Sequence, residues 1–218
     1  MKPIHSVKIR KGIGQENKMN MPGMMPESAG PHIRPATEAD AEALLEIYRY
    51  YVENTAVSFE WVTPTIAQFR ERIRKISARY PYFCAEMDGK IVGYAYAGEF
   101  KSRAAYAWSV ETTVYLERDA RRHGVGRALY AALAEALHKM GVRNMCACIA
   151  VPTKEDKTLT FDSMHFHEHM GFHLVGRFTA SGCKFGRWYD MIWMEKMIGE
   201  HTENPCPVIP YPEVSARK

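Results

Sequence analysis

The chain has 218 residues, of which 46% are hydrophobic and 25% charged, enough to bury one substantial core. Its 29 basic and 25 acidic side chains leave a net charge of +4. Residues 1–32 carry five basic and two acidic groups, so the rest of the chain has a surplus of only one positive charge. A nearly neutral body argues against a broad nucleic-acid-binding surface.

Location and redox state follow from what the sequence lacks. No stretch reaches the ~20 apolar residues of a bilayer span, and residues 1–20 have no apolar centre typical of a secretory signal. The five cysteines are an odd number, thinly spread, which favours reduced thiols over a disulfide framework. We therefore expect a cytoplasmic protein.

Composition divides the chain into three parts. Residues 1–31 show no periodicity and are expected to form a disordered tail. Residues 32–198 are expected to form one domain. Residues 199–218 contain four prolines, which predict an extended tail without a regular helix, able to dock on a neighbouring surface.

Two amphipathic helices open the predicted domain. Thr37-x-x-Asp40 is a start typical of a capping box. A second helix should begin at Thr63-Pro64, because proline suits the first helical turn. The predicted apolar faces are Leu44, Ile47, Tyr48, Tyr51 and Val52 in the first helix, and Ile66, Phe69, Ile73 and Ile76 in the second.

The periodicity then changes to that of strands. Residues 82–87 and 91–100 flank Asp88-Gly89, the strongest hairpin signal in the chain, and a third strand is expected over residues 106–116. The remaining elements, in order, are a polar turn over residues 117–126, a helix with Val125, Leu129, Leu133, Leu137 and Met140 on one face and Gly141 as its stop, a strand over 145–151, a helix over 161–170 ended by Gly171, and strands over 172–178 and 188–195. This order predicts an α/β (α+β) domain with a mixed sheet of about six to seven strands and helices on its faces.

The polar turn, residues 117–126, which we call the elbow, is the first candidate binding site. Where a strand turns into a helix, unpaired backbone N–H groups and the positive end of the helix dipole point outward. Gly124 and Gly126 allow a ligand to approach the backbone. The surrounding side chains suit a diphosphate: Arg121, Arg122, His123 and Arg127.

Two common phosphate motifs do not fit the elbow. A phosphate loop needs a Lys-Ser/Thr pair after its second glycine, and none follows Gly126. The dinucleotide fingerprint needs a third glycine where Leu129 stands. On these residues alone, a solvated helix start remains an open alternative.

Arg121-x-x-Gly124-x-Gly126, after a strand ending in residues 114–116, resembles the acetyl-coenzyme A site of the GNAT N-acetyltransferase family. The resemblance implies that the turn's amides bind the coenzyme's pyrophosphate and that the preceding strand pairs with the pantetheine arm. The coenzyme-binding residues so implied are Val114, Tyr115, Leu116, Arg121, Arg122, His123, Gly124, Val125, Gly126 and Arg127.

More narrowly, the chain resembles phosphinothricin N-acetyltransferases over about residues 33–196. The matching stretches are residues 33–40, 101–108 and 111–115, His167-Glu168 with Gly171-Phe172, and residues 182–190. This resemblance implies a homodimer and direct acetyl transfer without an acyl-enzyme. We expect no metal.

Glu111 is the candidate general base. An amine with a pKa near ~8 or above is mostly protonated at neutral pH, so a base is useful. Glu111 lies in an otherwise apolar and hydroxyl-bearing strand, where burial would raise its pKa. The family resemblance also implies this role, acting directly or through water. A solvent-facing glutamate is the alternative.

His167 is the second catalytic candidate, by resemblance. The broader family often has a tyrosine there that protonates the leaving thiolate, whereas the phosphinothricin branch has a histidine, as here. A packed histidine is the alternative. His165 and His169 share a helix face from which His167 points away, so three-fold metal ligation fails.

Other candidates are weaker. By resemblance, Arg103 and Tyr106 match positions beside the acceptor, while Phe59 and Lys184 lie in matching segments; a surface arginine and a core phenylalanine are the alternatives. Thr160 stands where the family often has a coenzyme-binding asparagine, and it is the candidate coenzyme contact at that position. The connection over residues 152–161 looks longer than in the phosphinothricin enzymes and could reshape the acceptor mouth or a subunit contact.

Cys146 and Cys148 are expected to be small core residues, because positions two apart on a strand share a face and neither cysteine has a convincing His-plus-base partner.

We therefore expect an acetyl-coenzyme A-dependent N-acetyltransferase for the α-amine of a small amino acid or analogue, such as phosphinothricin or methionine sulfoximine. Acetylation of a protein N-terminus or a polyamine remains an alternative, as does a non-catalytic acyl-coenzyme A sensor. The bulky Phe59, Trp61, Arg103 and Tyr106 argue mildly against the first two acceptors. No nucleic-acid or membrane partner is expected.

Overall fold

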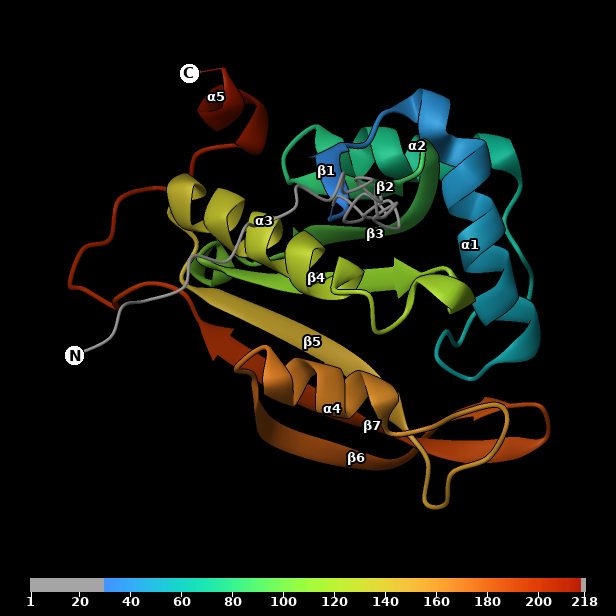
Figure 1. Cartoon of the computed structure of the whole chain (residues 1–218). Helices are drawn as coiled ribbons and strands as arrows, with labels where there is room; N and C mark the ends of the chain where they lie inside the picture. The colour runs from blue at the N-terminus through green and yellow to red at the C-terminus, as the bar shows by residue number, and fades with distance from the viewer. Residues whose placement is uncertain (1–29, 217–218) are drawn as a thin grey trace, which may run out of the picture.

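A computed structural model describes residues 30–216, so most of the predicted N-terminal tail lies outside the described residues. Seven strands form one sheet in the order β1-β2-β3-β4-β5-β7-β6 (Figure 1). The strands are β1 (His32–Pro35), β2 (Tyr82–Met87), β3 (Lys90–Glu99), β4 (Ser109–Leu116), β5 (Asn144–Val151), β6 (His173–Lys184) and β7 (Arg187–Met197). The helices are α1 (Ala41–Asn54), α2 (Ile66–Ser77), α3 (Val125–Met140), α4 (Asp162–His169) and α5 (Tyr211–Ser215). Among the described strands, β4 and β5 alone pair in parallel, so the predicted mixed sheet with helices is confirmed.

Helices cover both faces of the sheet (Figure 1). Alternation along β2 shows how one strand serves two cores, because successive side chains point to opposite faces. Tyr82 and Cys84 pack with α1 and α2. Phe83 and Ala85 pack with α3, together with partly buried side chains of α4. The sheet is therefore the middle layer of three.

The helix starts follow capping chemistry. At Thr37 the predicted capping box is present, and the Thr37 amide donates to Asp40 Oδ2 at 2.7 Å. The second helix begins at Ile66, three residues later than Thr63, because Thr65 and Gln68 form their own capping box. The Thr65 amide donates to Gln68 Oε1 at 2.8 Å. Ile66, predicted on the apolar stripe, is 41% exposed at this first turn.

Helix α3 is bounded as predicted. Its predicted apolar face is buried, and Gly141 ends it with φ 93°, donating to the His138 carbonyl at 3.0 Å. Gly124 precedes it with φ 78°. Within residues 30–216, neither α3 nor any other helix combines the length and apolar composition that crossing a bilayer requires.

The strands differ from prediction mainly at their ends. The hairpin at Asp88-Gly89 is confirmed. β4 begins at Ser109 instead of residue 106, because Ala104–Tyr106 forms a 3-10 turn, η2. β6 and β7 are longer than predicted and join through Phe185 (φ 52°) and Gly186 (φ 70°). A phenylalanine gives no sequence signal for such a turn.

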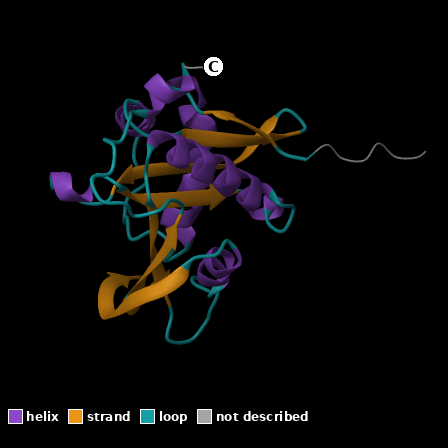
Figure 2. Cartoon of the chain, turned by 90° about the vertical axis from the view of Figure 1, so that its left-hand side faces the viewer, coloured by secondary structure: helices purple, strands orange, loops and turns teal. Residues whose placement is uncertain are grey.

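The sheet opens between β4 and β5. These strands pair only over residues 109–111 and 144–146, the last pair being Glu111 with Cys146. Beyond that pair they diverge, and β5, β7 and β6 lie apart from the half of the sheet formed by β1–β4 (Figure 2). From residue 112 onward, the edge of β4 that faces β5 therefore has no strand partner.

The C-terminal segment docks on the body of the domain. The Trp108 indole donates to the Cys206 carbonyl at 2.9 Å, and the Ile209 amide donates to the Met140 carbonyl at 2.9 Å. Val208, Tyr211 and Val214 pack against the core. The expectation of no regular helix here is wrong, because Pro212 stands in the first turn of α5, where a missing N–H breaks no helical hydrogen bond.

Candidate active site

A cavity of about 540 Å³ fills the opening between β4 and β5. Its lining comes from residues 111–115 of β4, residues 147–150 of β5 and residues 57–60 after α1. Tyr130 of α3 and His167 of α4 also line it, as do Tyr48, Tyr96, Ser163, Ser181 and Met191. The site therefore lies where the sheet splits, and distant segments supply its walls.

Side chains of β4 enter this cavity from both faces of the sheet, because neighbours on a strand point in opposite directions. Glu111 shares a face with Tyr115, which packs against Tyr48 of α1 with ring centroids 5.0 Å apart. Thr112 is on the α3 face, where its Oγ1 lies 3.4 Å from the Tyr130 hydroxyl. A carboxylate and a hydroxyl pair thus face one cavity from opposite sides.

Glu111 is only partly buried, and burial raises the pKa of its carboxyl above the usual range. The Lys101 ammonium opposes this shift. Among residues 30–216 no side chain forms a hydrogen bond or ion pair with Glu111. A carboxylate that is accessible from a cavity, with a raised pKa, is suited to accept a proton.

His167 is buried, and both of its ring nitrogens are occupied. Nδ1 lies 2.7 Å from the Ser163 carbonyl, and Nε2 lies 2.9 Å from the Tyr130 hydroxyl. A carbonyl can only accept, so the proton is assigned to Nδ1, and Tyr130 then donates to Nε2. Burial lowers the His167 pKa to about 4, so the ring is neutral at pH 7. His167 can therefore act on a ligand mainly through Tyr130.

Sequence reasoning missed Tyr130. Its hydroxyl is buried and its pKa is raised by burial, so it keeps its proton across the physiological range. One signal was available: Tyr130 follows Gly126 by four residues and therefore lies on the same helical face, one turn further from the elbow. This face packs closely against α4, since a Cβ at Gly126 would lie 3.0 Å from the Phe166 ring.

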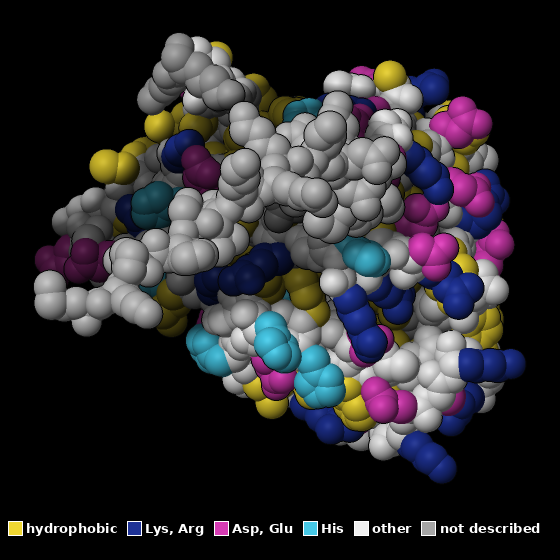
Figure 3. All heavy atoms as spheres, in the orientation of Figure 1, with side chains coloured by type: hydrophobic (Ala, Val, Ile, Leu, Met, Phe, Trp, Pro, Cys, Tyr) yellow, Lys and Arg dark blue, Asp and Glu magenta, His cyan; other side chains and the backbone are white. Residues whose placement is uncertain are grey.

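The elbow presents backbone groups at the start of α3. Arg122 (φ 65°) and Gly124 (φ 78°) both adopt left-handed conformations. The first helical hydrogen bond runs from the Ala128 amide to the Gly124 carbonyl at 3.0 Å, so the amides of residues 125–127 have no partner within the helix. Lys and Arg side chains gather over this turn (Figure 3). Unused amides, the helix dipole and basic side chains form a concentrated anion site.

Arg121 ties the elbow to α1. Its Nη2 donates to the Tyr51 hydroxyl at 3.2 Å, and that hydroxyl donates to the Leu116 carbonyl at 2.6 Å. Asp162 lies 3.9 Å from Arg121 Nη1. Part of the Arg121 donor capacity is therefore spent on holding the end of β4 in place.

The family model described as an acetyltransferase (GNAT) domain matches residues 33–193. The chain belongs to the GNAT acetyltransferase family. It is 34% identical over 191 residues to a phosphinothricin N-acetyltransferase from Streptomyces viridochromogenes, covering 88% of this chain and 100% of that protein. It is 31% identical to an L-methionine sulfoximine/L-methionine sulfone acetyltransferase from Salmonella typhimurium, covering 78% and 96%.

Among solved structures, the chain is similar to a GNAT phosphinothricin acetyltransferase from Sinorhizobium meliloti in complex with acetyl-coenzyme A, with a TM-score of 0.74 and 34% identity. The match covers 84% of this chain and 99% of that one. The protein is therefore an N-acetyltransferase, and its acyl donor is acetyl-coenzyme A.

The elbow of this acetyltransferase fits the donor's pyrophosphate. A Cβ at Gly124 would meet nothing within 4 Å, so the approach to the amides is open. Arg122, His123 and Arg127 are exposed around it. Beyond Glu111, the free edge of β4 over residues 112–116 fits the predicted pairing with the pantetheine arm.

Thr160 lies at the start of α4. Its side chain is exposed, and its Oγ1 accepts from the Asp162 amide at 3.3 Å. The hydroxyl thus serves the helix start, and a contact between Thr160 and the coenzyme stays a prediction.

The four predicted acceptor residues are not brought together. Phe59 lines the cavity. Arg103 and Tyr106 are exposed beside η2, outside the lining, and their role stays a prediction. Lys184 does not line the cavity either, because its ammonium is buried and donates to two backbone carbonyls. The Lys184 ammonium is thus engaged by the backbone, and its contact with the acceptor stays a prediction.

The two strand cysteines differ in exposure. Cys146 is buried, as expected, but Cys148 is exposed and lines the cavity beside Glu111, because the sheet has already opened there. Desolvation by the protein around the cavity raises the pKa of both thiols to about 11, so neither is a thiolate at neutral pH. This favours direct transfer over a cysteine acyl-enzyme.

Histidines gather over α4 (Figure 3). His165 and His169 are exposed, and His173 lies 3.1 Å from Glu195. Within the described part of the chain, no three side chains of metal-binding type come together.

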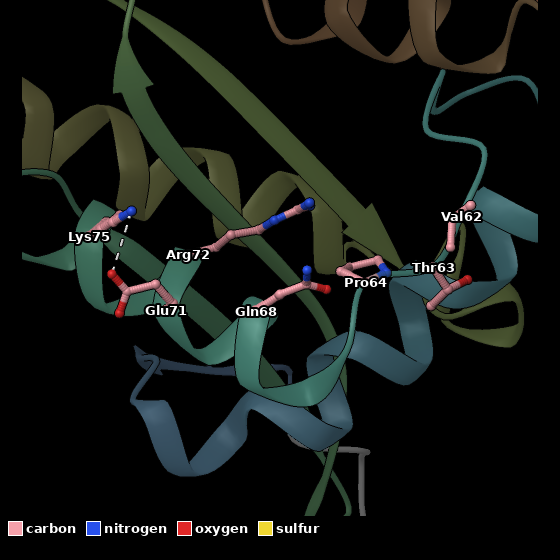
Figure 4. Close-up of a pocket in the computed structure, with 7 residues that line it drawn as sticks. All are labelled: Val62, Thr63, Pro64, Gln68, Glu71, Arg72 and Lys75. Atoms are coloured by element: carbon pink, nitrogen blue, oxygen red, sulfur yellow. Dashed lines mark ion pairs between the residues drawn. The ribbon is translucent and has the colours of Figure 1, made fainter.

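A second hollow, of about 390 Å³, lies between residues 62–64 and α2 (Figure 4). Glu71 and Lys75 form an ion pair on one side of it. Arg72, also in its lining, pairs with Glu60 at 2.7 Å. None of the predicted site residues lines this hollow, so it carries no catalytic assignment.

Proposed function

We propose that this acetyltransferase acetylates the α-amine of a small amino acid or analogue, of the phosphinothricin or methionine sulfoximine type. The observation that carries the proposal is the position of Glu111, a carboxylate of raised pKa facing a cavity closed on one side by residues 57–60. A small amine fits a cavity of about 540 Å³, whereas a peptide needs an open groove. The names of the relatives support the same acceptor class.

In the proposed reaction, Glu111 takes the proton that the acceptor ammonium must lose, directly or through one water. Acetyl-coenzyme A supplies the acetyl group as a thioester. A nitrogen–carbon bond forms, a carbon–sulfur bond breaks, and the sulfur takes up a proton. Tyr130, on the α3 face, keeps its proton, and its hydroxyl stabilises the leaving sulfur by a hydrogen bond when it turns that proton away from His167 Nε2. His167 acts as a positioning residue, because its Nε2 accepts from that hydroxyl before the transfer and so keeps it beside the cavity.

The test is an amine panel with acetyl-coenzyme A, monitored by release of free thiol. The panel contains phosphinothricin, methionine sulfoximine, the common amino acids, an N-terminal peptide and spermidine. We expect thiol release with amino acids or their analogues, and the acetylated amine in mass spectra. Release with the peptide or spermidine only would overturn the acceptor class, and coenzyme binding without any release would overturn catalysis.

We also propose that the enzyme is a homodimer that uses β6. β6 is at the edge of the sheet, where its unpaired backbone groups can accept another strand. Exposed apolar side chains follow this strand and its neighbour β7: Leu174, Val175, Phe178 and Trp188. Light scattering should give twice the 24.9 kDa chain mass, and Phe178→Glu should reduce it. A wild-type monomer at micromolar concentration would contradict this.

We further propose a cytoplasmic location. All five cysteines, including the exposed Cys148 and Cys206, are free thiols, which suits a reducing compartment. Fractionation of native cells should recover the enzyme with the cytosolic fraction; recovery with an oxidising compartment would contradict this.

A further inference from the structure

Lys184 has a side chain that is buried, whereas most lysine side chains lie at the protein surface. It ends β6 and is only 2% exposed. Its Nζ donates to the Val52 carbonyl at 2.7 Å and to the Ser58 carbonyl at 2.6 Å. Lysines are almost never buried this deeply without partners. The two carbonyls are therefore the partners that satisfy this buried ammonium.

The first carbonyl belongs to a helix end. Val52 lies in the last turn of α1, where carbonyls have no partner within the helix. That turn contains no basic residue of its own. The ammonium of Lys184, which arrives from a strand 132 residues later in the chain, caps the helix and meets the negative end of its dipole.

The second carbonyl belongs to the cavity wall, which we define as residues 55–60. Ser58 Oγ lies 2.8 Å from the Tyr48 hydroxyl, and residues 57–60 line the cavity. The ammonium therefore bridges the end of α1 and the wall. Glu60, also in the wall, is the acidic side chain whose charge acts on Lys184.

A second contact between the hairpin and the wall involves Phe59. A Cβ at Gly182 would lie 2.2 Å from the Phe59 ring, so the backbone of β6 is in close contact with that ring. Tyr189 of β7 packs beside that ring, with the two ring planes tilted by 38° and the ring centroids 6.4 Å apart. On the other side, the Ala56 amide donates to the Thr158 carbonyl at 3.0 Å. The wall is thus held by the β6–β7 hairpin and by the 152–161 connection.

We propose that Lys184 is a positioning residue for the acceptor: its ammonium fixes the wall, and hence Phe59, against the cavity. This inference rests on the proposed function for its kinetic consequence and on the structure alone for its conformational one. Without the ammonium, two buried carbonyls lose their donor and the wall is free to move away from Glu111. The elbow has a contact of its own with α1, because the Tyr51 hydroxyl accepts from Arg121 and donates to the Leu116 carbonyl.

Lys184→Met tests the proposal because it keeps the apolar stem and removes the charge. We expect the acceptor KM to rise at least tenfold and the acetyl-coenzyme A KM to change less than threefold. Chymotrypsin cleavage after Phe59 or Trp61 should accelerate at least tenfold. Lys196→Met is the matched control for cleavage, since Lys196 Nζ also donates to a carbonyl, that of Met170 at 2.7 Å, but away from the wall. Its wall cleavage should equal that of the wild type.

Gly182→Ala gives a second route if Lys184→Met does not fold. The added methyl displaces the Phe59 ring while the ammonium stays, so acceptor KM and wall cleavage should both rise. Wild-type acceptor KM and cleavage in a folded Lys184→Met or Gly182→Ala protein would overturn the positioning role. Faster cleavage in an enzyme that acetylates no amino acid would instead retain the conformational claim and reject the proposed acceptor.

Discussion

The elbow and the acceptor side of the cavity bind their ligands with different parts of the chain. The elbow takes its anion-binding groups from one continuous segment and uses mainly backbone amides, with Gly124 keeping the approach open. The acceptor side takes its groups from β4, β5, the wall and the β6–β7 hairpin, and uses side chains such as Glu111 and Phe59. The first depends on local conformation, whereas the second depends on the packing of distant segments.

This difference has an energetic consequence. Every residue except proline has a backbone N–H group, whatever its side chain. Anion binding at the elbow therefore depends on the backbone conformation of one or two residues. On the acceptor side, each group depends on its burial: the pKa of Glu111 is raised and that of His167 is lowered by the surrounding protein. Substitutions should therefore separate coenzyme binding from acceptor chemistry.

The largest expected effect comes from Glu111→Gln, which removes the base and keeps the shape of the side chain. We expect kcat to fall by ~10²–10⁴-fold, the usual contribution of general acid–base catalysis. The dissociation constant for acetyl-coenzyme A, measured by calorimetry, should stay within twofold. Glu99→Gln, on an exposed residue of the neighbouring strand, serves as the control. Equal loss of coenzyme affinity would show that Glu111 is structural.

The pH profile gives an independent reading of the same group. A raised pKa means that Glu111 becomes protonated, and inactive as a base, at a higher pH than an ordinary glutamate. The wild-type kcat/KM should fall as pH decreases through that raised pKa. In Glu111→Gln this acidic limb should disappear; its persistence would assign the limb to another group.

The next effect in size concerns His167 and stability. The pKa of His167 is 6.5 in the unfolded chain and about 4 in the folded protein. The folded state therefore binds fewer protons between these two pH values. Stability should thus be complete above pH 6.5 and fall by up to ~3 kcal/mol as pH decreases through about 4. Urea unfolding at several pH values should show this slope in the wild type and in His165→Gln, and a reduced slope in His167→Gln.

The smallest effect concerns Tyr130→Phe, which keeps the ring against Phe166 and removes the hydroxyl. The variant loses one hydrogen bond to the leaving sulfur, which is worth ~1–1.5 kcal/mol. We therefore expect a roughly tenfold lower kcat, with the acetyl-coenzyme A KM nearly unchanged. Tyr211→Phe, on α5, is the control and should keep the wild-type kcat. An unchanged kcat in Tyr130→Phe would remove Tyr130 from the mechanism.

The contrast between the two regions also explains what the sequence could predict. The elbow, α3 and the Asp88-Gly89 hairpin depend on glycine, proline and apolar spacing within a few residues, and the sequence predicted them. The split after Glu111 was missed, because it depends on which strand pairs with β5 beyond Cys146. No pattern of neighbouring residues indicates where two distant strands stop pairing.

Tyr130 and Lys184 illustrate the same limit within the site. Tyr130 is one aromatic residue in a largely apolar helix, and only its contact with His167, 37 residues later, distinguishes it. Lys184 matched an acceptor segment, but its partners are backbone carbonyls, which no residue type reveals. Such roles emerge only once the sheet brings distant segments together.

One kinetic experiment tests the division between the two regions most directly: both KM values measured for Gly124→Val and for Gly182→Ala. A β-branched residue at φ 78° strains the backbone by ~1–2 kcal/mol even though its Cβ meets nothing within 4 Å, so Gly124→Val should raise the acetyl-coenzyme A KM about tenfold and leave the acceptor KM nearly unchanged. Gly182→Ala should do the reverse. Equal increases of both KM values in both variants would contradict the account.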